Sequence, residues 1–437
     1  MILILLFIIQ TALFLSVKLN IFPELFYFPW LITQGHIPYK DFFDHHGFFL
    51  YYLLAPFSLD TSLSTLKVVS YCVSSTTFLY TFLVLKKYSN GIQLFIGGLL
   101  YISLQFFVTG ANMWYETFIA LCYAIILYLV NSTVDRKYIF LGILIAIVSM
   151  IKPTSAIILI PVLIFERDFR IPVISALAWI PAGIYFYIQN ALPVLVDNMF
   201  AFNSFYGNYM LKERVFFMDK MFLLKLIFGF VIASGYMFFY RKSKQLFITT
   251  IFFVFSLIHI VPRFEYTNLV PVIPFYILIL ILPLKYIKSL SAKNIYTIFL
   301  VIILVIVTKK IIQVVPWMLT RKTYVENSYM CDVYQRTLIK EENSSFYVFA
   351  NNPELYYLTG KSIKLHHPLV FPWYQEYFPQ LEQRIISDVN AENINYILIP
   401  TILDARYVSL KATRTFIDQK FYLSKKHIPC LSVARSV

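Results

Sequence analysis

The sequence is poor in charged residues. Asp, Glu, Lys and Arg make up 14% of its 437 residues, against about 25% in an ordinary soluble protein. Hydrophobic residues account for 59% of the chain, and its mean hydropathy is +0.69. A soluble globule could not bury that much apolar surface in one core. The shortage of charge therefore excludes a soluble globular protein and predicts a polytopic α-helical membrane protein.

Other common signatures are also missing. The four cysteines fall in no CxxC pair and in no metal-ligand spacing. The chain has no P-loop, no GxGxxG turn and no Ser-His-Asp pattern, which excludes the common nucleotide-binding motifs. The first apolar segment lacks a small-residue cleavage site, so we expect an uncleaved membrane span there and not a signal peptide.

The apolar runs, divided at charges, prolines and turn residues, predict about eleven membrane spans of roughly twenty residues or fewer. They lie near residues 1–17, 64–85, 91–109, 113–131, 137–151, 153–165, 172–189, 221–240, 245–261, 267–284 and 295–314.

Basic residues fall in alternate loops between these spans, which accounts for the net charge of +14 without a nucleic-acid partner. The basic loops carry Lys86 and Lys87, Arg136 and Lys137, Arg167 and Arg170, Arg241, Lys242 and Lys244, and Lys285, Lys288 and Lys293. Because positively charged loops stay in the cytoplasm, the pattern predicts a cytoplasmic N-terminus. Residues 18–63, 190–220 and those after about 315 are then expected on the outer face.

The composition changes after Trp317, where the chain becomes charged and mixed. Two strands and two helices are predicted there: strands at 345–350 and 395–400, helices at 352–360 and 377–391. Their order indicates a small α/β domain. We therefore expect a transmembrane domain over residues 1–318 and an extracytoplasmic α/β domain over residues 319–437.

Ionisable residues gather on the predicted outer face, where membrane proteins carry them at a cost and usually for a function. They are Glu24, Asp41, Asp44, His45 and His46 in the first outer loop, Glu116 at the start of a span, Lys152 between two spans, and Arg263 and Glu265 before another. Their shared face predicts one common site.

Asp41 and Asp44 lie three residues apart and would share one face of a helix. One carboxylate can take a proton from a hydroxyl while the other tunes its pKa. The alternative is a solvated loop whose charges only terminate helices. Asp44 with His45 and His46 could ligate a metal, but adjacent residues seldom both reach one ion. We therefore expect hydrogen bonding or phosphate contact from the histidines, and no metal.

Three further residues each have two interpretations. Lys152 is a fixed cation suited to a phosphate group, or a lysine at a helix end whose ammonium reaches water. Arg263 faces the same choice, although its planar guanidinium grips phosphate more specifically. Glu116 contacts a substrate or caps a helix N-terminus at the membrane interface.

Several segments resemble motifs of bacterial GT-C glycosyltransferases, the polytopic enzymes grouped with protein O-mannosyltransferases and lipid A aminoarabinose transferases. G-H-I-P-Y-K-D-F-F-D-H-H-G-F-F in the first outer loop resembles the family signature G-x-x-x-Y-x-D-F…G-P, with G-F in place of G-P. The later segments W-Y-E-T-F, L-G-I-L-I-A-I-V-S-M-I-K-P-T, P-R-F-E-Y-T-N-L-V-P-V-I-P and N-P-E-L-Y-Y-L-T-G resemble later motifs of the family, in the same order.

This resemblance implies inverting transfer of a sugar from a polyprenyl-phosphate carrier to a glycan, lipid or protein acceptor, on the outer face of a bacterial plasma membrane. The catalytic acid of the family lies in the first outer loop. It is carried over first to Asp41, which fits Y-x-D-F, and then to Asp44 and Glu24. In K-L-N-I-F-P-E, Asn20 or Glu24 stands where an aspartate is usual.

The resemblance also implies which residues bind the substrates. Lys152 and Arg263 are expected to contact the carrier phosphate. The other expected substrate-binding residues are Glu116, His45, His46, Tyr39 and Tyr266. No cofactor is implied beyond the lipid-linked donor.

Two alternatives remain open. A polysaccharide polymerase or ligase of the O-antigen type is also polytopic and outward-facing, but usually has an Arg-rich working loop late in the chain and no folded tail. A transporter of lipid-linked sugars would show inverted repeats and helices broken at the midplane. The sequence shows no repeat, which favours an enzyme.

Overall fold

The computed structural model describes residues 1–109, 111–213, 244–260, 265–320, 346–348, 354–360, 365–368, 373–392, 396–400, 411–423 and 431–436, together with residues 224, 227, 231, 235, 323, 371 and 394. The chain divides into two units. The first unit comprises Met1–Asn20, Lys67–Ala182 and Met210–Arg321, and the second comprises Ile21–Leu66, Gly183–Tyr209 and Lys322–Val437.

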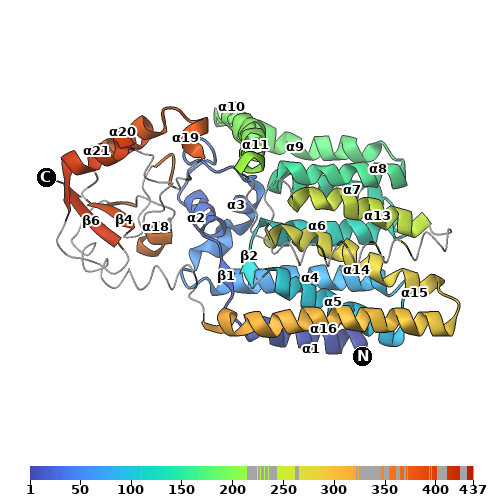
Figure 1. The fold of residues 1–437 in the computed structure, drawn as a ribbon. Helices are drawn as coiled ribbons and strands as arrows, with labels where there is room; N and C mark the ends of the chain where they lie inside the picture. The colour runs from blue at the N-terminus through green and yellow to red at the C-terminus, as the bar shows by residue number, and fades with distance from the viewer. Residues whose placement is uncertain are drawn as a thin grey trace. The chain divides into compact units, whose positions relative to one another are not determined.

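The first unit is a bundle of apolar helices (Figure 1). Its α-helices are α1 (Ile2–Leu15), α4 (Ser64–Leu85), α5 (Gly91–Thr109), α6 (Tyr115–Val130), α7 (Lys137–Ile151), α8 (Leu159–Glu166), α9 (Arg170–Ile188), α13 (Lys244–Ser256), α14 (Ile273–Ile281), α15 (Pro283–Tyr286) and α16 (Leu290–Thr320). Its 3-10 turns are η3 (Pro153–Ile158), η5 (Leu257–Ile260) and η6 (Thr267–Val272), and the short strands β1 (Asn20–Ile21) and β2 (Asn112–Met113) lie at its margin.

Five helical segments among the described residues are long and apolar enough to cross a membrane. They are Ser64–Leu85, Gly91–Thr109, Arg170–Ile188, Thr267–Tyr286 and Leu290–Thr320. Shorter apolar helices accompany them, so the chain is a multi-pass membrane protein. The span predicted at 221–240 lies almost wholly outside the described residues, and the total of eleven spans stays a prediction.

Helices α14 and α16 have opposite environments. Every residue of α14 is buried, whereas most of the long helix α16 is exposed. The exposed side chains of α16 are large and apolar, for example Ile298, Val305 and Ile312. Such a surface is unfavourable in water and favourable against lipid chains. The bundle therefore has α14 at its centre and a lipid-facing surface at α16.

The chain breaks its helical path between α7 and α8. Pro153 has no backbone N–H and disfavours helical geometry in the residue before it. Lys152 accordingly has an extended backbone, with φ −153° and ψ 114°, and the chain continues as the 3-10 turn η3. This break is what directs the Lys152 side chain away from an ordinary helix surface.

Several predicted cytoplasmic loops lie at one end of the bundle. The Lys87 ammonium donates to the carbonyl of Asn131 at 2.5 Å, and Lys285 lies over the Tyr88 ring at 5.1 Å. Lys137 pairs with Glu166 at 2.8 Å. The loops that follow α4, α6, α8 and α15 are therefore close together, as alternate loops of a membrane bundle must be (Figure 1).

The second unit contains a four-stranded sheet of order β3-β4-β6-β5. Its strands are β3 (Phe346–Val348), β4 (Tyr396–Pro400), β5 (Phe421–Leu423) and β6 (Leu431–Ser436). β3 and β4 are parallel, with Tyr347 opposite Ile397, and the other two pairs are antiparallel. Both strands predicted from the sequence, at 345–350 and 395–400, coincide with strands of this sheet.

Helices complete the second unit. They are η1 (Pro23–Leu25), α2 (Tyr27–Thr33), α3 (Phe49–Leu54), η2 (Ala55–Leu59), α10 (Leu192–Val196), the π-helical turn η4 (Asp197–Phe202), α11 (Asn203–Glu213), α18 (Glu354–Thr359), α19 (Tyr374–Tyr377), α20 (Leu381–Ala391) and α21 (Lys411–Lys420). Helix α20 buries Leu381, Ile385 and Val389, one face of an amphipathic helix.

The first predicted outer loop, residues 18–63, and the C-terminal tail pack together within the second unit. The Tyr357 hydroxyl of α18 donates to the carbonyls of Ser58 at 2.7 Å and Asp60 at 2.9 Å. The Tyr357 ring lies 4.9 Å from that of Phe26. The tail thus shares a core with residues of the first loop. The predicted domain bounds, 1–318 and 319–437, stay a prediction.

Candidate active site

The segment between α2 and α3, residues 34–48, carries most of the predicted catalytic residues and is not helical. The Asp41 N–H donates to the carbonyl of Ile37 at 2.9 Å, and the Tyr39 N–H donates to that of Phe42 at 2.8 Å. Tyr39 has φ 68°, a left-handed conformation that costs a non-glycine residue about 1 kcal/mol. Helical spacing therefore does not place Asp41 and Asp44 on one face.

Asp41 is half-buried and lightly bonded. Its Oδ2 accepts a hydrogen bond from the Ile37 N–H at 2.7 Å, the one side-chain hydrogen bond it makes among the described residues. Its charge also lies near His366, where it opposes the larger lowering of the His366 pKa by burial. A carboxylate with one oxygen available and partial access to solvent can accept a proton from a substrate hydroxyl.

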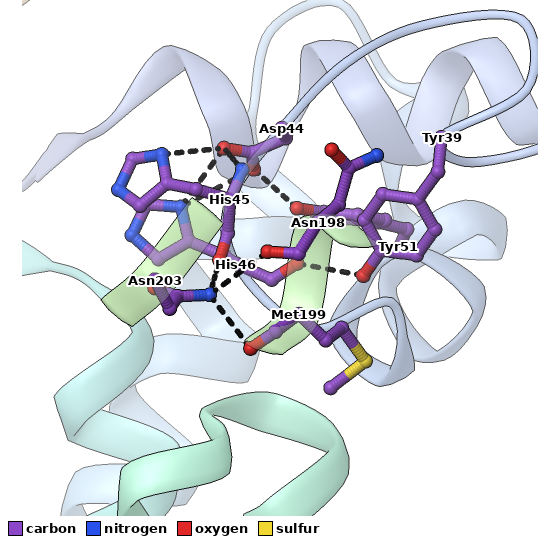
Figure 2. A network of polar contacts seen from close by, with 8 residues as sticks. All are labelled: Tyr39, Asp44, His45, His46, Tyr51, Asn198, Met199 and Asn203. Atoms are coloured by element: carbon purple, nitrogen blue, oxygen red, sulfur yellow. Dashed lines mark hydrogen bonds and ion pairs between the residues drawn. The ribbon is translucent and has the colours of Figure 1, made fainter. Parts of the chain in front are cut away.

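Asp44 has the opposite environment, with 1% of its surface exposed. Its carboxylate accepts hydrogen bonds from the His45 N–H at 2.7 Å, from His46 Nδ1 at 3.1 and 3.2 Å, and from the Tyr51 hydroxyl (Figure 2). Burial alone raises the pKa of Asp44, but the charges and hydrogen bonds of His46 and His45 outweigh it and hold this pKa well below its usual value. Asp44 is therefore a weak base suited to orienting its neighbours.

Other residues hold the backbone of His45 and His46 in place. The Tyr39 hydroxyl donates to the carbonyl of His46 at 2.7 Å. Asn203 Nδ2, at the start of α11, donates to the carbonyl of His45 at 2.8 Å and to those of Asn198 and Met199 at 3.1 Å each (Figure 2). The segment 190–213, part of a loop predicted on the outer face, thus contributes to the site through Asn203.

The remaining predicted residue of the first loop is Glu24. It lies in η1 and is 8% exposed. Its burial fits a functional or a structural carboxylate equally, because buried acids are rare unless they are bonded.

A second polar group lies in the first unit. Glu116 is in the first turn of α6, and its Oε1 pairs with the Lys152 ammonium at 2.7 Å. The Glu116 side chain is 2% exposed and that of Lys152 is 27% exposed. The Lys152 side chain is therefore the accessible member of the pair, and a phosphate oxygen could approach its ammonium group.

Helix α6 makes further polar contacts through Tyr123, which follows Glu116 by seven residues. The Tyr123 hydroxyl donates to the carbonyl of Ser155 at 2.9 Å and lies 2.9 Å from His259 Nε2. The Ser155 carbonyl lies in the 3-10 turn η3 and not in an α-helix, and the Tyr123 hydroxyl gives it a hydrogen-bond donor. Tyr266, at the start of η6, packs edge-on against Phe107 at 5.6 Å.

The predicted site residues thus occupy two places. Asp41, Asp44, His45, His46, Tyr39 and Glu24 belong to the second unit, and Glu116, Lys152 and Tyr266 belong to the first. Arg263 lies outside the described residues. All of these assignments stay predictions.

Sequence reasoning missed several residues of the site. Tyr51 follows Asp44 by seven residues and could have been noticed in the same segment. Asn203 lies far along the chain from His45, and Tyr123 and His259 lie in apolar runs, so no local pattern singles them out. The structure also brings one possible ligand atom from each of Asp44, His45 and His46 within 4.8 Å of the others.

Comparison with known proteins identifies the fold. No protein-family model and no curated protein matches the sequence. Among solved structures, the chain is similar to the oligosaccharyltransferase of Archaeoglobus fulgidus, a crystal structure in complex with zinc and sulfate. The TM-score is 0.54 at 11% sequence identity, and the match covers 100% of this chain and 73% of the other. The chain therefore shares the overall fold of this solved structure.

Proposed function

We propose that the protein is a membrane glycosyltransferase of the GT-C type. It transfers a sugar from a polyprenyl-phosphate carrier to a glycan, lipid or protein acceptor on the extracytoplasmic face, with inversion. The observation that carries this proposal is the whole-chain similarity to an oligosaccharyltransferase. The buried polar network in the first outer loop supports it, since polar groups at a membrane surface need a function to offset their cost.

The proposed reaction is a single displacement. The acceptor hydroxyl attacks the anomeric carbon while Asp41 takes its proton, and the bond from that carbon to the phosphate oxygen breaks. Polyprenyl phosphate leaves with the electron pair. Asp41 is assigned as the base because it is half-buried and makes only one side-chain hydrogen bond among the described residues. Asp44 orients His46 and Tyr51.

The cation that stabilises the departing phosphate is assigned to Lys152, with Arg263 as its predicted partner. The Lys152 ammonium is anchored by Glu116 at 2.7 Å and remains partly exposed. A fixed cation stabilises developing negative charge without reorganising during the reaction. The Glu116–Lys152 pair is thus a preformed phosphate contact.

Analysis of lipid-linked sugars in a deletion strain tests this function. One polyprenyl-phosphate sugar should accumulate in the outer leaflet, where membrane-impermeant reagents reach it. Expression of the natural chain should clear it, and expression of Asp41→Asn should not. An unchanged pool of lipid-linked sugars would refute the transferase, and accumulation confined to the inner leaflet would identify a transporter.

A further inference from the structure

Two adjacent lysines, Lys309 and Lys310, interrupt the apolar surface of α16. Residues 294–308 before them and 311–320 after them contain no charged side chain. Lys293 marks the basic end of this span, and the helix rises about 24 Å from there to Lys309. The hydrocarbon core of a bilayer is about 30 Å thick. The pair therefore lies within or at the edge of the lipid hydrocarbon.

The Lys309 side chain is on the lipid-facing side of the helix. Helix α16 buries one stripe of side chains, formed by Tyr296, Leu300, Val307, Ile311 and Met318. Val305 precedes Lys309 by four residues and Ile312 follows it by three, and they are 60% and 67% exposed. Residues at these spacings share a helix face. Lys309 is itself exposed and Lys310 is half-buried, so both ammonium groups are accessible from the lipid.

The part of the chain that the structure describes supplies no counter-charge to this pair. Neither ammonium group makes a hydrogen bond or an ion pair with a described residue. Helix α16 packs along α5, and neither helix contains an aspartate or a glutamate (Figure 1). Like charges on neighbouring residues repel each other, and more strongly where the dielectric constant is low. An anion from outside the chain relieves this repulsion.

The bias of basic residues toward cytoplasmic loops does not account for the pair. Helix α16 begins directly after α15, at the end of the bundle where Lys285 lies over the Tyr88 ring. Lys309 is about 28 Å further along the helix, near the opposite end of the bundle. Charged residues inside membrane spans are costly and are usually functional. This position therefore needs a reason other than topology.

Two further side chains extend the polar patch along the same face. Gln313 follows Lys309 by four residues and is exposed, so its amide is close to the Lys309 ammonium. Trp317 follows Gln313 by four residues and is 56% exposed. Tryptophan is enriched at the level of the lipid headgroups. The patch thus places cationic and amide donors between a headgroup-level aromatic ring and an apolar surface, an arrangement that fits a lipid phosphate.

We propose that Lys309, Lys310 and Gln313 bind the phosphate of an anionic phospholipid from the surrounding bilayer. The two ammonium groups and the Gln313 amide donate to the phosphate oxygens. The acyl chains lie along the exposed apolar face of α16 that includes Val305. The proposal does not rest on the glycosyltransferase function, because lipid binding is measurable without a sugar donor.

Native mass spectrometry of the detergent-purified full chain tests the site, because it counts only the lipids that stay bound. The protein is titrated with phosphatidylglycerol, or with phosphatidylcholine, in which choline neutralises the phosphate. We expect one phosphatidylglycerol per chain at concentrations that leave phosphatidylcholine unbound. Lys309→Gln/Lys310→Gln should weaken phosphatidylglycerol binding by about 10- to 30-fold, the effect of losing two cations beside an anionic lipid. Lys309→Arg/Lys310→Arg keeps both charges and should retain the lipid.

The same helix region offers a matched control in Lys288 and Lys293. Lys288 is exposed and Lys293 is half-buried, as are Lys309 and Lys310. Lys288→Gln/Lys293→Gln removes the same charge and should change phosphatidylglycerol binding by less than about twofold, because these ammonium groups reach water at the helix end. Thermal unfolding in detergent shows whether each variant is folded.

Three results would overturn the site. One is equal retention of phosphatidylglycerol and phosphatidylcholine by the natural chain. Another is an equal loss of phosphatidylglycerol in both glutamine variants, which would show attraction to positive charge in general. The third is tighter retention of a polyprenyl phosphate than of phosphatidylglycerol at this patch, lost in Lys309→Gln/Lys310→Gln, which would assign the lysines to the carrier lipid.

Discussion

Asp41 and Asp44 differ in the number of donors that reach their carboxylates. Asp44 is buried and accepts hydrogen bonds from His45, His46 and Tyr51, and its pKa is held low. A carboxylate stabilised in this way has little affinity for a further proton. Asp41 is half-buried, and among the described residues its carboxylate accepts a hydrogen bond at Oδ2 alone. The two acids therefore suit different tasks, base for Asp41 and orientation for Asp44.

This difference predicts the effect of removing each charge. Asp41→Asn keeps the shape of the side chain and removes its basicity, so turnover should fall by about 100-fold or more. Asp44→Asn should lower it less. Sugar transfer by purified protein measures both. The control is Asp60→Asn, at a partly exposed carboxylate of the same unit that accepts hydrogen bonds from Ser62, Ser64 and Thr65 before and at the start of α4. Full activity in Asp41→Asn with complete loss in Glu24→Gln would move the base to Glu24.

The Glu116–Lys152 pair combines stability with binding. Lys152→Met leaves the buried Glu116 charge without its partner. Removing one member of a buried pair costs about 3–5 kcal/mol, and we expect about 1–3 kcal/mol here because Lys152 is partly exposed. The donor KM should also rise, because the phosphate contact is lost.

Adding Glu116→Gln to Lys152→Met separates these two effects. The double variant should recover most of the thermal stability, since no buried charge is left unpaired, while its donor KM stays high. Thermal unfolding in detergent and donor titration measure the two quantities. A double variant with normal donor KM would show that Lys152 is purely structural.

At the scale of elements, the loop between α2 and α3 is joined to the tail through two histidines. The Phe43 N–H donates to the His366 carbonyl at 2.6 Å, and the Phe43 ring lies 5.5 Å from that of His367. Burial and the nearby Arg384 charge lower the pKa of His366 from 6.5 to about 4. Burial and the neighbouring His366 and Arg384 also hold the pKa of His367 well below 6.5.

Lowering the pH should therefore destabilise the packing of the loop that carries Phe43 against His366 and His367. Between pH 6.5 and about 4 the unfolded histidine binds more protons than the folded one, so the free energy of unfolding falls as pH falls through this range. We expect a loss on the order of 2 kcal/mol between pH 7 and pH 4.5, measured by thermal unfolding. Above pH 6.5 the contribution is complete and constant.

His366→Gln/His367→Gln should show a flatter pH dependence than the natural chain. The comparison also separates the histidines from Asp388, whose pKa burial raises and which therefore acts in the opposite sense. Identical slopes in the two proteins would show that other groups control acid unfolding.

Helices α7 and α9 approach closely at Gly142. A methyl group there would lie 2.7 Å from Ile174 Cβ and 2.9 Å from the Ile171 carbonyl oxygen. Gly142→Ala should therefore separate the helices and cost about 1–3 kcal/mol, the usual range for overpacking. Gly183→Ala is the matched control, because nothing lies within 4 Å of its added methyl group. Equal thermal stability of the two variants would contradict this packing.

Local patterns predicted the elements better than the site. The span expected at 137–151 coincides with α7, and Lys152-Pro153 breaks the helix as proline chemistry requires. Apolar length and proline act within a few residues, so one segment of sequence is enough. The contact of Asn203 with His45 joins distant parts of the chain, and its only physical cause is the tertiary fold. The left-handed backbone at Tyr39 is accompanied by hydrogen bonds to Phe42 and His46, within the same loop, and no helical or strand periodicity signals it.

At the scale of the whole molecule, the clustering of basic loops constrains topology. Lys87, Lys137 and Lys285 lie at one end of the bundle of the first unit, where they bond Asn131, Glu166 and the Tyr88 ring. Loops at the same end of a membrane bundle lie on the same side of the membrane. If that side is the cytoplasm, as positive charge favours, the start of α6 with Glu116 and the break at Lys152 face outward.

Reporter fusions test this orientation. A reporter active only in the cytoplasm should be active when inserted after Asp135, in the basic loop between α6 and α7, and silent when fused after Val437. A reporter active only outside should show the reverse at both places. The paired insertions control for expression, because each fusion is silent with one reporter and active with the other. Cytoplasmic activity after Val437 would invert the assignment of the tail, and with it the outward placement of Asp41 and the proposed reaction on the extracytoplasmic face.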